Sequence, residues 1–203
     1  MLLDHIAIGC ESLDEGCVWT EAALGVSLRP GGQHQRFGTH NRLLGLGDGV
    51  YLEVIAIDPT ATHSGPRWFG LEQFRGAPRL VNWICSTGDL DADLARAPVA
   101  AGRELDLERG DLKWRIAVPE DGSLPLGGGY PTLIEWAAGT HHPADRLGPS
   151  GVRLLDWTVR HPDADMLRAS LAPELTGVPV RFERASAPAF RARFATPKGE
   201  VVL

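Results

Sequence analysis

A short apolar segment with one polar residue near its centre occurs three times in this chain. The copies span residues 3–8, 80–85 and 154–159, and their polar residues are His5, Asn82 and Asp156. His5 and Asn82 are 77 positions apart, Asn82 and Asp156 are 74 apart, and an acidic, helix-like phrase follows each copy. Recurrence at a near-constant period indicates a repeated supersecondary unit. We therefore predict three copies of one unit that begins with a strand and a helix.

The first unit contains signals for one helix and four strands. Ser12 followed by Glu15 is a capping-box pattern that predicts a helix start, and Gly25 predicts its end. Strands are predicted at residues 1–8, 26–28, 42–46 and 50–57, with a loop at 30–34 and a Gly-Asp-Gly turn at 47–49. The predicted element order is therefore β-α-β-β-β.

The second unit repeats this order, and the third repeats its first part. In the second unit a helix is predicted at 89–97 and strands at 80–85, 103–108, 113–118 and 132–138, with a glycine-rich loop at 127–131. The expected fold is a single α+β domain whose repeated β-α-β-β-β modules form curled mixed sheets around a cleft. Its parts are module one (1–58), a connector (59–78), module two (79–139), a linker (140–150) and a truncated, structural third module (151–203) that ends before supplying a glutamate.

Composition narrows the class of protein. Of the 203 residues 43% are apolar and 23% charged, which is typical of a globular chain, and the net charge of −6 disfavours a nucleic-acid partner. There is no apolar run of membrane-spanning length and no secretory signal pattern. Three cysteines without metal-type spacing indicate reduced thiols, so we expect a cytoplasmic protein. Its expected partner is a small molecule, with no nucleic-acid or membrane partner. The expected oligomeric state is a monomer or homodimer.

Two glutamates stand inside matching apolar strands near the ends of the first two modules. Residues 51–56 read YLEVIA and residues 133–138 read LIEWAA, so Glu53 corresponds to Glu135. An ionised carboxylate in an apolar strand is costly unless it is paired or bound to a cation. If the modules are related by pseudo-symmetry, His5, Glu53, Glu135 and the residue at position 82 come together. One imidazole and two carboxylates suit a divalent transition metal that keeps open positions.

The paired modules, with LDHIAI at the start and YLEVIA at the end of the first, resemble the vicinal oxygen chelate superfamily, which includes glyoxalase I, extradiol dioxygenases and bleomycin-resistance proteins. Several further phrases are similar to those of glyoxalase-like domain proteins. They are GGQH at 31–34, GTHN at 38–41, GDGVYLE at 47–53, LIEW at 133–136 and HPAD at 142–145. The resemblance covers almost the whole chain and implies a shared scaffold on which different functions are built.

The resemblance implies metal ligands at His5, Glu53, Asn82 and Glu135. Asn82 departs from the histidine common at that place, and an amide oxygen is a poor ligand for such an ion. The site then has three protein ligands (His5, Glu53 and Glu135), or His34 or His142 replaces Asn82, or no metal binds. Residues expected to contact the substrate are His34, Asn41, Asn82, Trp114, Arg115 and His142.

The leading interpretation is a lyase, isomerase or dioxygenase that uses Zn, Ni, Mn or Fe and acts on a small oxygenated metabolite. Glu53 and Glu135 are the candidate catalytic residues, as ligand or general base. The alternative is a metal-free binding or sequestering protein of the resistance type with an aromatic-lined cavity. In a third interpretation the glutamates only form internal salt bridges with Arg42 or Arg115.

Overall fold

The computed structural model describes residues 1–203 and contains both predicted β-α-β-β-β modules. Module one consists of β1 (Leu2–Gly9), α1 (Leu13–Leu24), β2 (Arg29–His34), β3 (Thr39–Gly45) and β4 (Tyr51–Ile57). Module two consists of β5 (Arg79–Ser86), α2 (Leu90–Arg96), β6 (Arg103–Arg109), β7 (Leu112–Val118) and β8 (Thr132–Trp136). A 3₁₀ turn, η1 (Pro125–Gly128), precedes β8, and a short helix, α3 (Pro143–Leu147), follows it.

Helix α1 begins after Ser12 and ends before Gly25, as predicted from the sequence. Ser12 has an extended backbone at the N-cap, although its side chain makes no capping hydrogen bond. Gly25 ends the helix at φ 72°, and its N–H donates to the Glu21 carbonyl. A residue with a Cβ is strained in this left-handed conformation, so glycine suits the position. The next strand differs from prediction: β2 covers residues 29–34, which were expected to form a loop.

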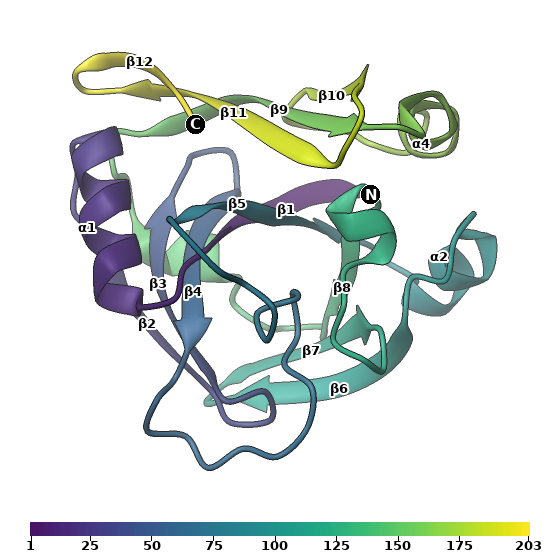
Figure 1. The fold of residues 1–203 in the computed structure, drawn as a ribbon, viewed down its shortest axis with the longest axis horizontal. Helices are drawn as coiled ribbons and strands as arrows, with labels where there is room; N and C mark the ends of the chain where they lie inside the picture. Colours follow the sequence, from purple (N-terminus) through teal and green to yellow (C-terminus); the bar gives the residue numbers. More distant parts are fainter.

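The two modules form one eight-stranded mixed sheet in the order β2-β3-β4-β1-β5-β8-β7-β6. In each module the first strand lies parallel to the last one, β1 beside β4 and β5 beside β8. The modules meet where β1 runs antiparallel to β5. The sheet curls until the edge strands approach one another, so that it encloses a concave face (Figure 1). The predicted curled mixed sheet around a cleft is thus confirmed.

Strand alternation separates the two faces of this sheet. On β1 and β4 one set of side chains, including Ala7 and Ile55, belongs to an apolar cluster on the concave face. The intervening side chains, including Ile6 and Val54, belong to the larger core on the convex face. A polar side chain on these strands therefore faces the enclosed space only if it is an even number of positions from Ala7 on β1 or from Ile55 on β4.

The C-terminal segment forms a second sheet of four strands. Its elements are β9 (Arg153–His161), α4 (Ala164–Leu171), β10 (Val180–Arg184), β11 (Ala189–Thr196) and β12 (Gly199–Val202), with the strand order β10-β9-β11-β12. The element order matches that of the modules, but the pairing does not, because β9 lies parallel to the strand that follows the helix. Contrary to expectation, this segment does supply a glutamate, Glu200 on β12, which pairs with Arg193.

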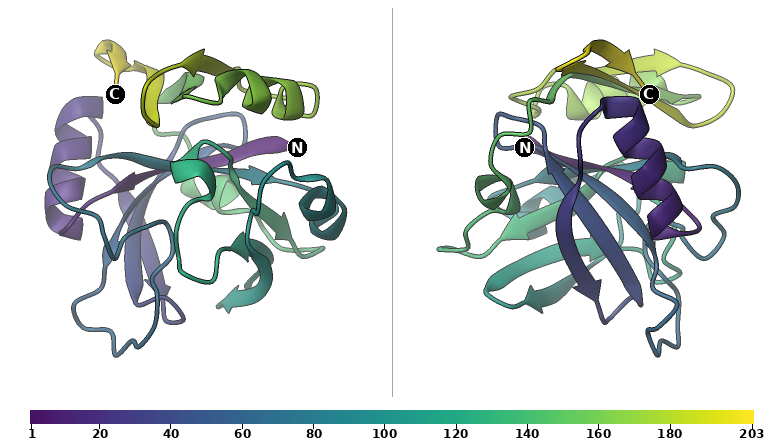
Figure 2. Two further views of the ribbon diagram at one scale, coloured as in Figure 1. Left: turned by 45° about the vertical axis from the view of Figure 1, so that its right-hand side comes forward. Right: turned by 90° about the vertical axis from the view of Figure 1, so that its left-hand side faces the viewer.

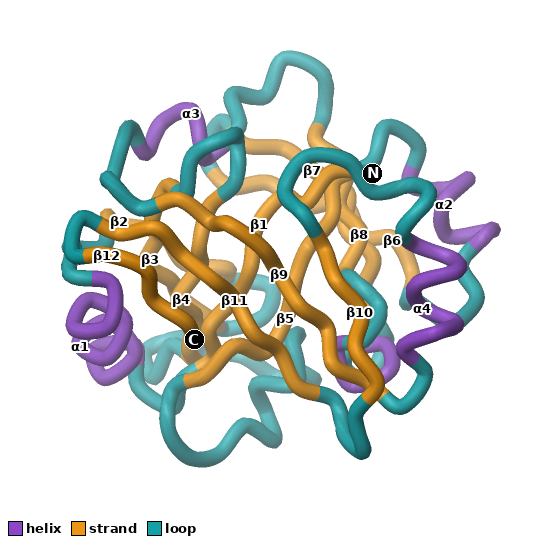
Figure 3. The backbone as a smooth tube through the Cα atoms, turned by 90° about the horizontal axis from the view of Figure 1, so that it is seen from above, coloured by secondary structure: helices purple, strands orange, loops and turns teal.

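The small sheet lies over the convex face of the large one (Figures 2 and 3). Trp83 of β5 and Trp157 of β9 are fully buried between the sheets, and Phe182 of β10 contacts the Trp83 ring with centroids 6.2 Å apart. The Leu154 N–H also donates to the Leu46 carbonyl. The C-terminal sheet thus completes the core of the protein and stays apart from the concave face. None of the helices is long and apolar enough to cross a membrane.

Candidate functional site

A small cavity of about 40 Å³ lies in the concave face, where side chains from both modules meet. Its polar residues come from four strands of module one and from the end of β6, and its apolar walls include three tryptophans. The polar residues are His5, His34, Asn41, Tyr51, Glu53 and Arg109, and the tryptophans are Trp68, Trp114 and Trp136. A polar, aromatic-walled space of this kind is the arrangement expected of a ligand site.

Glu53 is buried, with 4% of its surface exposed, and has the concave-face parity of Ile55. Its Oε1 accepts a hydrogen bond of 2.5 Å from the Asn41 amide nitrogen. Its Oε2 lies 3.8 Å from His5 Nε2, which is too long for a direct hydrogen bond. One oxygen of this carboxylate is therefore held in place, while the other is available to the cavity.

His5 is held from behind by a buried carboxylate. Its Nδ1 lies 2.6 Å from Asp4 Oδ1, so Nδ1–H donates to Asp4 and Nε2 points toward Glu53. Asp4 Oδ2 accepts from Trp136 Nε1 at 2.8 Å and from His142 Nε2 at 3.0 Å. Burial raises the pKa of Asp4, but these hydrogen bonds and the imidazole charges outweigh it and hold that pKa well below its usual range.

His34 and Arg109 join the two edge strands of the large sheet. Arg109 Nη1 lies 2.9 Å from His34 Nε2, and a guanidinium can only donate, so Nε2 is the acceptor. The proton of a neutral His34 ring is then on Nδ1, which donates to Thr39 Oγ1 at 3.1 Å. Burial of the ring and the adjacent Arg109 cation lower the pKa of His34 to about 3. His34 is therefore neutral at physiological pH and orients a cation that has no carboxylate partner.

The two glutamates that match in sequence do not come together. Leu133 belongs to the convex-face core and Ile134 to the concave-face cluster, so Glu135 has the parity of the convex face. Its Oε2 accepts from the Leu90 N–H at 2.7 Å and from Arg115 Nη2 at 2.8 Å. The salt bridge expected in the third interpretation is thus present for Glu135 and Arg115, while Glu53 contacts neither Arg115 nor Arg42.

The other predicted contact residues have different surroundings. Asn82 lies in the same row of residues as Glu53, but its side chain donates to Thr132 Oγ1 and accepts from the Trp83 N–H, so its polar atoms are used within the sheet. Trp114 lines the cavity. His142 caps α3 through Nδ1 and does not line the cavity, but it donates to Asp4 and its ring packs edge-on against Tyr51 and Trp136.

The set of side chains implied for a divalent metal is not brought together. His5 and Glu53 face each other, whereas Glu135 points away and the Asn82 oxygen is occupied. No group of three or more His, Cys, Asp or Glu side chains is placed to share an ion. Resident metals in proteins take three or four such ligands, and the unpaired Arg109 cation beside Glu53 also opposes a second cation. These residues do not fit a resident metal ion.

Besides Tyr51, whose ring stacks on His5, two further polar residues of this site were not singled out from the sequence. Asp4 is adjacent to His5 in β1, and in a regular strand the side chains of adjacent residues point to opposite faces of the sheet. An irregular register between β1 and β5 at this point brings it back to the His5 ring. Arg109 falls between the strands predicted at 103–108 and 113–118, next to Gly110, so it was not assigned to a strand. Neither position carries a local signal of function.

Paired β-α-β-β-β modules that form one curled sheet around a cavity are the architecture of the vicinal oxygen chelate class. The profile of the family described as "Glyoxalase-like domain" matches residues 3–176. The chain belongs to this family, which confirms the resemblance seen in the sequence. No curated protein matches.

One solved structure shows the same type of fold over most of its length. A hypothetical protein from Staphylococcus aureus aligns with a TM-score of 0.64 at 14% identity, covering 92% of this chain and 87% of its own. Methylmalonyl-CoA epimerases align over a smaller part of this chain. The Streptomyces coelicolor epimerase has 21% identity, a TM-score of 0.44 and coverage of 67% and 97%. The Mycobacterium tuberculosis epimerase has 20% identity, a TM-score of 0.44 and coverage of 66% and 85%.

Proposed function

We propose that this protein is an isomerase or lyase that moves a proton at a carbon next to a carbonyl group in a small, anionic, oxygenated metabolite. Glu53 is the general base. The observation that carries the proposal is the state of its two oxygens: Oε1 is fixed by Asn41, and Oε2 faces the cavity without a hydrogen bond. A buried carboxylate with one unengaged oxygen is suited to take up a proton.

Other polar groups of the cavity stabilise the negative charge that forms on the substrate. When Glu53 Oε2 removes the proton from carbon, the electron pair moves onto the carbonyl oxygen and gives an enolate. Arg109 donates to that oxygen, and His34 fixes the direction of the guanidinium. Return of a proton to the opposite face of the same carbon, or to a different atom of the enolate, completes an isomerisation, and loss of a group from the neighbouring carbon completes an elimination. The His5 ring, oriented by Asp4, stands beside Glu53 and can exchange the proton with it.

The entrance to the cavity favours an anionic substrate. The cavity itself has space only for the reacting end of a molecule, but Leu43, Arg109 and Pro143 also line an outer hollow of about 640 Å³. Arg29 and Arg146 lie on its rim. Arg146 is paired with Asp111, whereas Arg29 makes no ion pair. Two cations without partners along this path recognise a carboxylate or phosphate group on the substrate.

Solvent exchange at carbon tests the proposal without knowledge of the natural substrate. The protein is incubated in D₂O with a panel of small 2-oxo and 3-oxo carboxylates, and NMR measures deuterium entering the carbon next to the carbonyl. We expect exchange with at least one compound, and a loss of about 10²-fold or more in Glu53→Gln. Glu135→Gln is the matched control, because it makes the same change on the opposite face. Equal exchange in wild type and Glu53→Gln would refute the role of Glu53.

The same experiment separates this proposal from the metal-dependent version. Each assay is run after chelator treatment and again with Zn²⁺, Ni²⁺, Mn²⁺ or Fe²⁺ added. Exchange that survives chelation supports base catalysis by Glu53 with Arg109 as the charge-stabilising group. Exchange that requires an added ion, together with loss of ion binding in Glu53→Gln, would instead support the metal-dependent lyase, isomerase or dioxygenase predicted from the sequence.

A metal-free binding protein is the second candidate function. The aromatic walls formed by Trp68, Trp114 and Trp136 favour it, because such walls hold a ligand without chemistry. Saturable binding of a panel compound without deuterium exchange, retained in Glu53→Gln, would support this candidate. Binding that is weakened in Arg109→Gln would place the ligand in the same cavity.

A further inference from the structure

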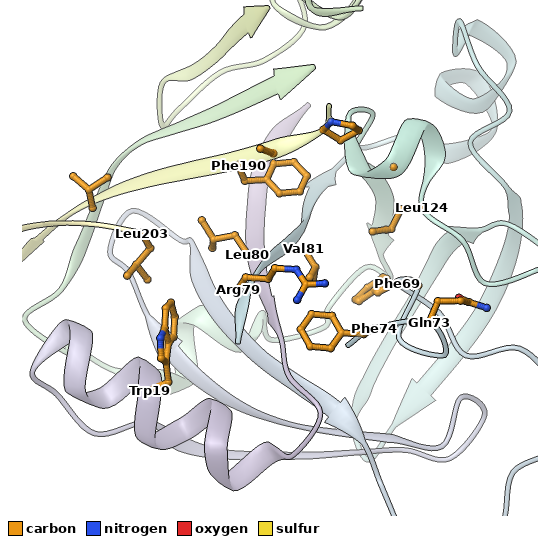
Figure 4. A pocket seen from close by; sticks show the side chains of 15 residues that line it. Trp19, Phe69, Gln73, Phe74, Arg79, Leu80, Val81, Leu124, Phe190 and Leu203 are labelled. Carbon is orange, nitrogen blue, oxygen red and sulfur yellow. The ribbon is translucent and has the colours of Figure 1, made fainter. Parts of the chain in front are cut away.

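A second, larger hollow of about 600 Å³ lies where β5 begins and the C-terminal sheet passes over it, and it is lined by side chains from both apolar clusters of the protein. It is walled by Trp19 of α1, by Phe74 of the connector, by Leu80 at the start of β5, and by Phe190 and Leu203 of the C-terminal segment (Figure 4). Ten of its fifteen lining residues are hydrophobic. Its volume is in the range of small-molecule sites.

One cation reaches into this apolar space. The guanidinium of Arg79 lies 4.0 Å from the centre of the Phe74 ring, and Figure 4 shows it between Phe74 and Val81. Its Nη1 donates to the carbonyls of Arg75 and Ala77 at 2.9 and 3.3 Å. It makes no ion pair, and no aspartate or glutamate side chain lines the hollow. Three of the five N–H donors of the guanidinium are on other nitrogens and are free for a ligand.

We infer that this hollow binds a free amphipathic molecule with an apolar chain and one carboxylate headgroup, and that Arg79 receives the headgroup. The apolar walls remove the chain from water, and the resulting stabilisation grows with the apolar area that is buried. Arg79 adds the complementary charge at one end, and stacking on Phe74 fixes the plane of the guanidinium for a two-point contact with a carboxylate.

This site is separate from the cavity that holds Glu53. Phe69 is the residue that lines both spaces, and its ring stacks on Trp68 with centroids 4.7 Å apart. Its backbone has φ 59°, an unusual conformation for a bulky residue, which the surrounding packing maintains. The Phe69 ring therefore forms a wall between the two spaces. Ligand binding at Arg79 does not depend on the proposed chemistry at Glu53.

Isothermal titration calorimetry with dodecanoate, kept below its micelle concentration, tests the inference directly. We expect one site per chain in the wild type, and binding weaker by about tenfold or more in Arg79→Gln, because a charge-assisted contact is lost. Arg75→Gln is the matched control: Arg75 lies four positions earlier, in the connector, and also donates to backbone carbonyls, but it lies outside this hollow. Dodecanol, which has the same chain without the charge, is expected to bind at least tenfold more weakly than dodecanoate.

A second variant tests the apolar part of the site. Ala189 on β11 lines the hollow, and Ala189→Trp fills space that the chain would occupy, so binding of dodecanoate should be lost. Glu53→Gln should bind dodecanoate as the wild type does, which keeps this result independent of the catalytic proposal. Equal affinity of Arg79→Gln and wild type, equal affinity for dodecanol, or loss of binding in Glu53→Gln would overturn the inference.

Discussion

Glu53 on β4 and Glu135 on β8 occupy matching phrases of the two modules, yet their carboxylates lie on opposite faces of the same sheet. Glu53 faces the enclosed cavity with Ile55, whereas Glu135 faces α2 and is held by the Leu90 N–H and Arg115. Side chains alternate along a strand, so an offset of one position between the modules is sufficient to reverse the face. The two modules therefore share one fold, but only module one places its glutamate in the cavity.

This relationship predicts opposite effects of one substitution at the two positions. Glu135→Gln weakens the ion pair with Arg115, and we expect it to lower the free energy of unfolding by about 1 kcal/mol, or the melting temperature by about 2–4 °C. Glu53→Gln removes a buried charge that has only one hydrogen bond, so stability should be unchanged or increased. Thermal unfolding by circular dichroism measures both. A larger loss of stability in Glu53→Gln than in Glu135→Gln would contradict this assignment of faces.

Arg109 is expected to be sensitive even to a conservative change. In Arg109→Lys the charge is kept, but the planar group that donates to His34 Nε2 and also faces the cavity is lost. We expect the rate of solvent exchange at saturating substrate to fall by about 10²-fold, which is typical for removal of one donor to a developing oxyanion. Arg29→Lys is the control in the outer hollow, and it should change the apparent affinity more than the rate. A rate in Arg109→Lys close to that of wild type would argue against this role.

Asp4 is expected to be the most important polar group for stability in the site. It is 3% exposed and accepts hydrogen bonds from His5, His142 and Trp136. Asp4→Asn keeps the shape but removes the charge and places an NH₂ group against these donors, so we expect a loss of about 2–4 kcal/mol in urea unfolding.

The pH dependence of this loss follows from the lowered pKa of Asp4. The folded-state pKa is below the ordinary value of 3.8, so the carboxylate contributes its full stability above that pH and loses it as the pH falls further. The difference in unfolding free energy between wild type and Asp4→Asn should therefore shrink as the pH falls below 3.8. A difference that grows as the pH falls below 3.8 would contradict the ionised state of Asp4.

The architecture was predictable because it depends on local patterns. Gly25, for example, ends α1 as expected, and Asp89 caps α2 by accepting from the Ala92 N–H. Apolar runs and turn residues of this kind report on each strand and helix separately. The pairing of the C-terminal sheet was not predictable in the same way, because strand order is decided by packing across the Trp83–Trp157 core rather than by any one segment.

The site was predicted only in part for a related reason. His5 and Glu53 stand on neighbouring strands of one module, and their proximity follows from the fold. Arg109 and His34 are 75 positions apart and meet because the sheet curls, which no short sequence window records. Face parity in β8 was ambiguous, since Ile134 and Glu135 both lie in an apolar run and either could face inward. The curling of the sheet and the face to which each β8 side chain points could therefore not be predicted from the sequence.

Because the pKa of His34 is lowered in the folded protein, we expect acid to lower the free energy of unfolding. The ring stays neutral in the folded protein until the pH approaches 3, whereas in the unfolded chain it binds a proton near its ordinary pKa of 6.5. Between these values the unfolded state holds more protons, so the free energy of unfolding must fall as the pH decreases from about 6.5 toward 3. One such group contributes a slope of at most about 1.4 kcal/mol per pH unit.

Urea unfolding at half-unit intervals from pH 7.5 to 4.5 measures this slope. In His34→Gln the amide replaces the ring without a titrating group, so the slope in this range should become clearly smaller. His63→Gln is the matched control, because His63 lies outside the cavity and its ring hydrogen-bonds only to the Gly65 carbonyl, and its slope should equal that of wild type. If His34→Gln and wild type showed the same slope, His34 would not be held neutral by Arg109, and the positioning of that guanidinium would need another explanation.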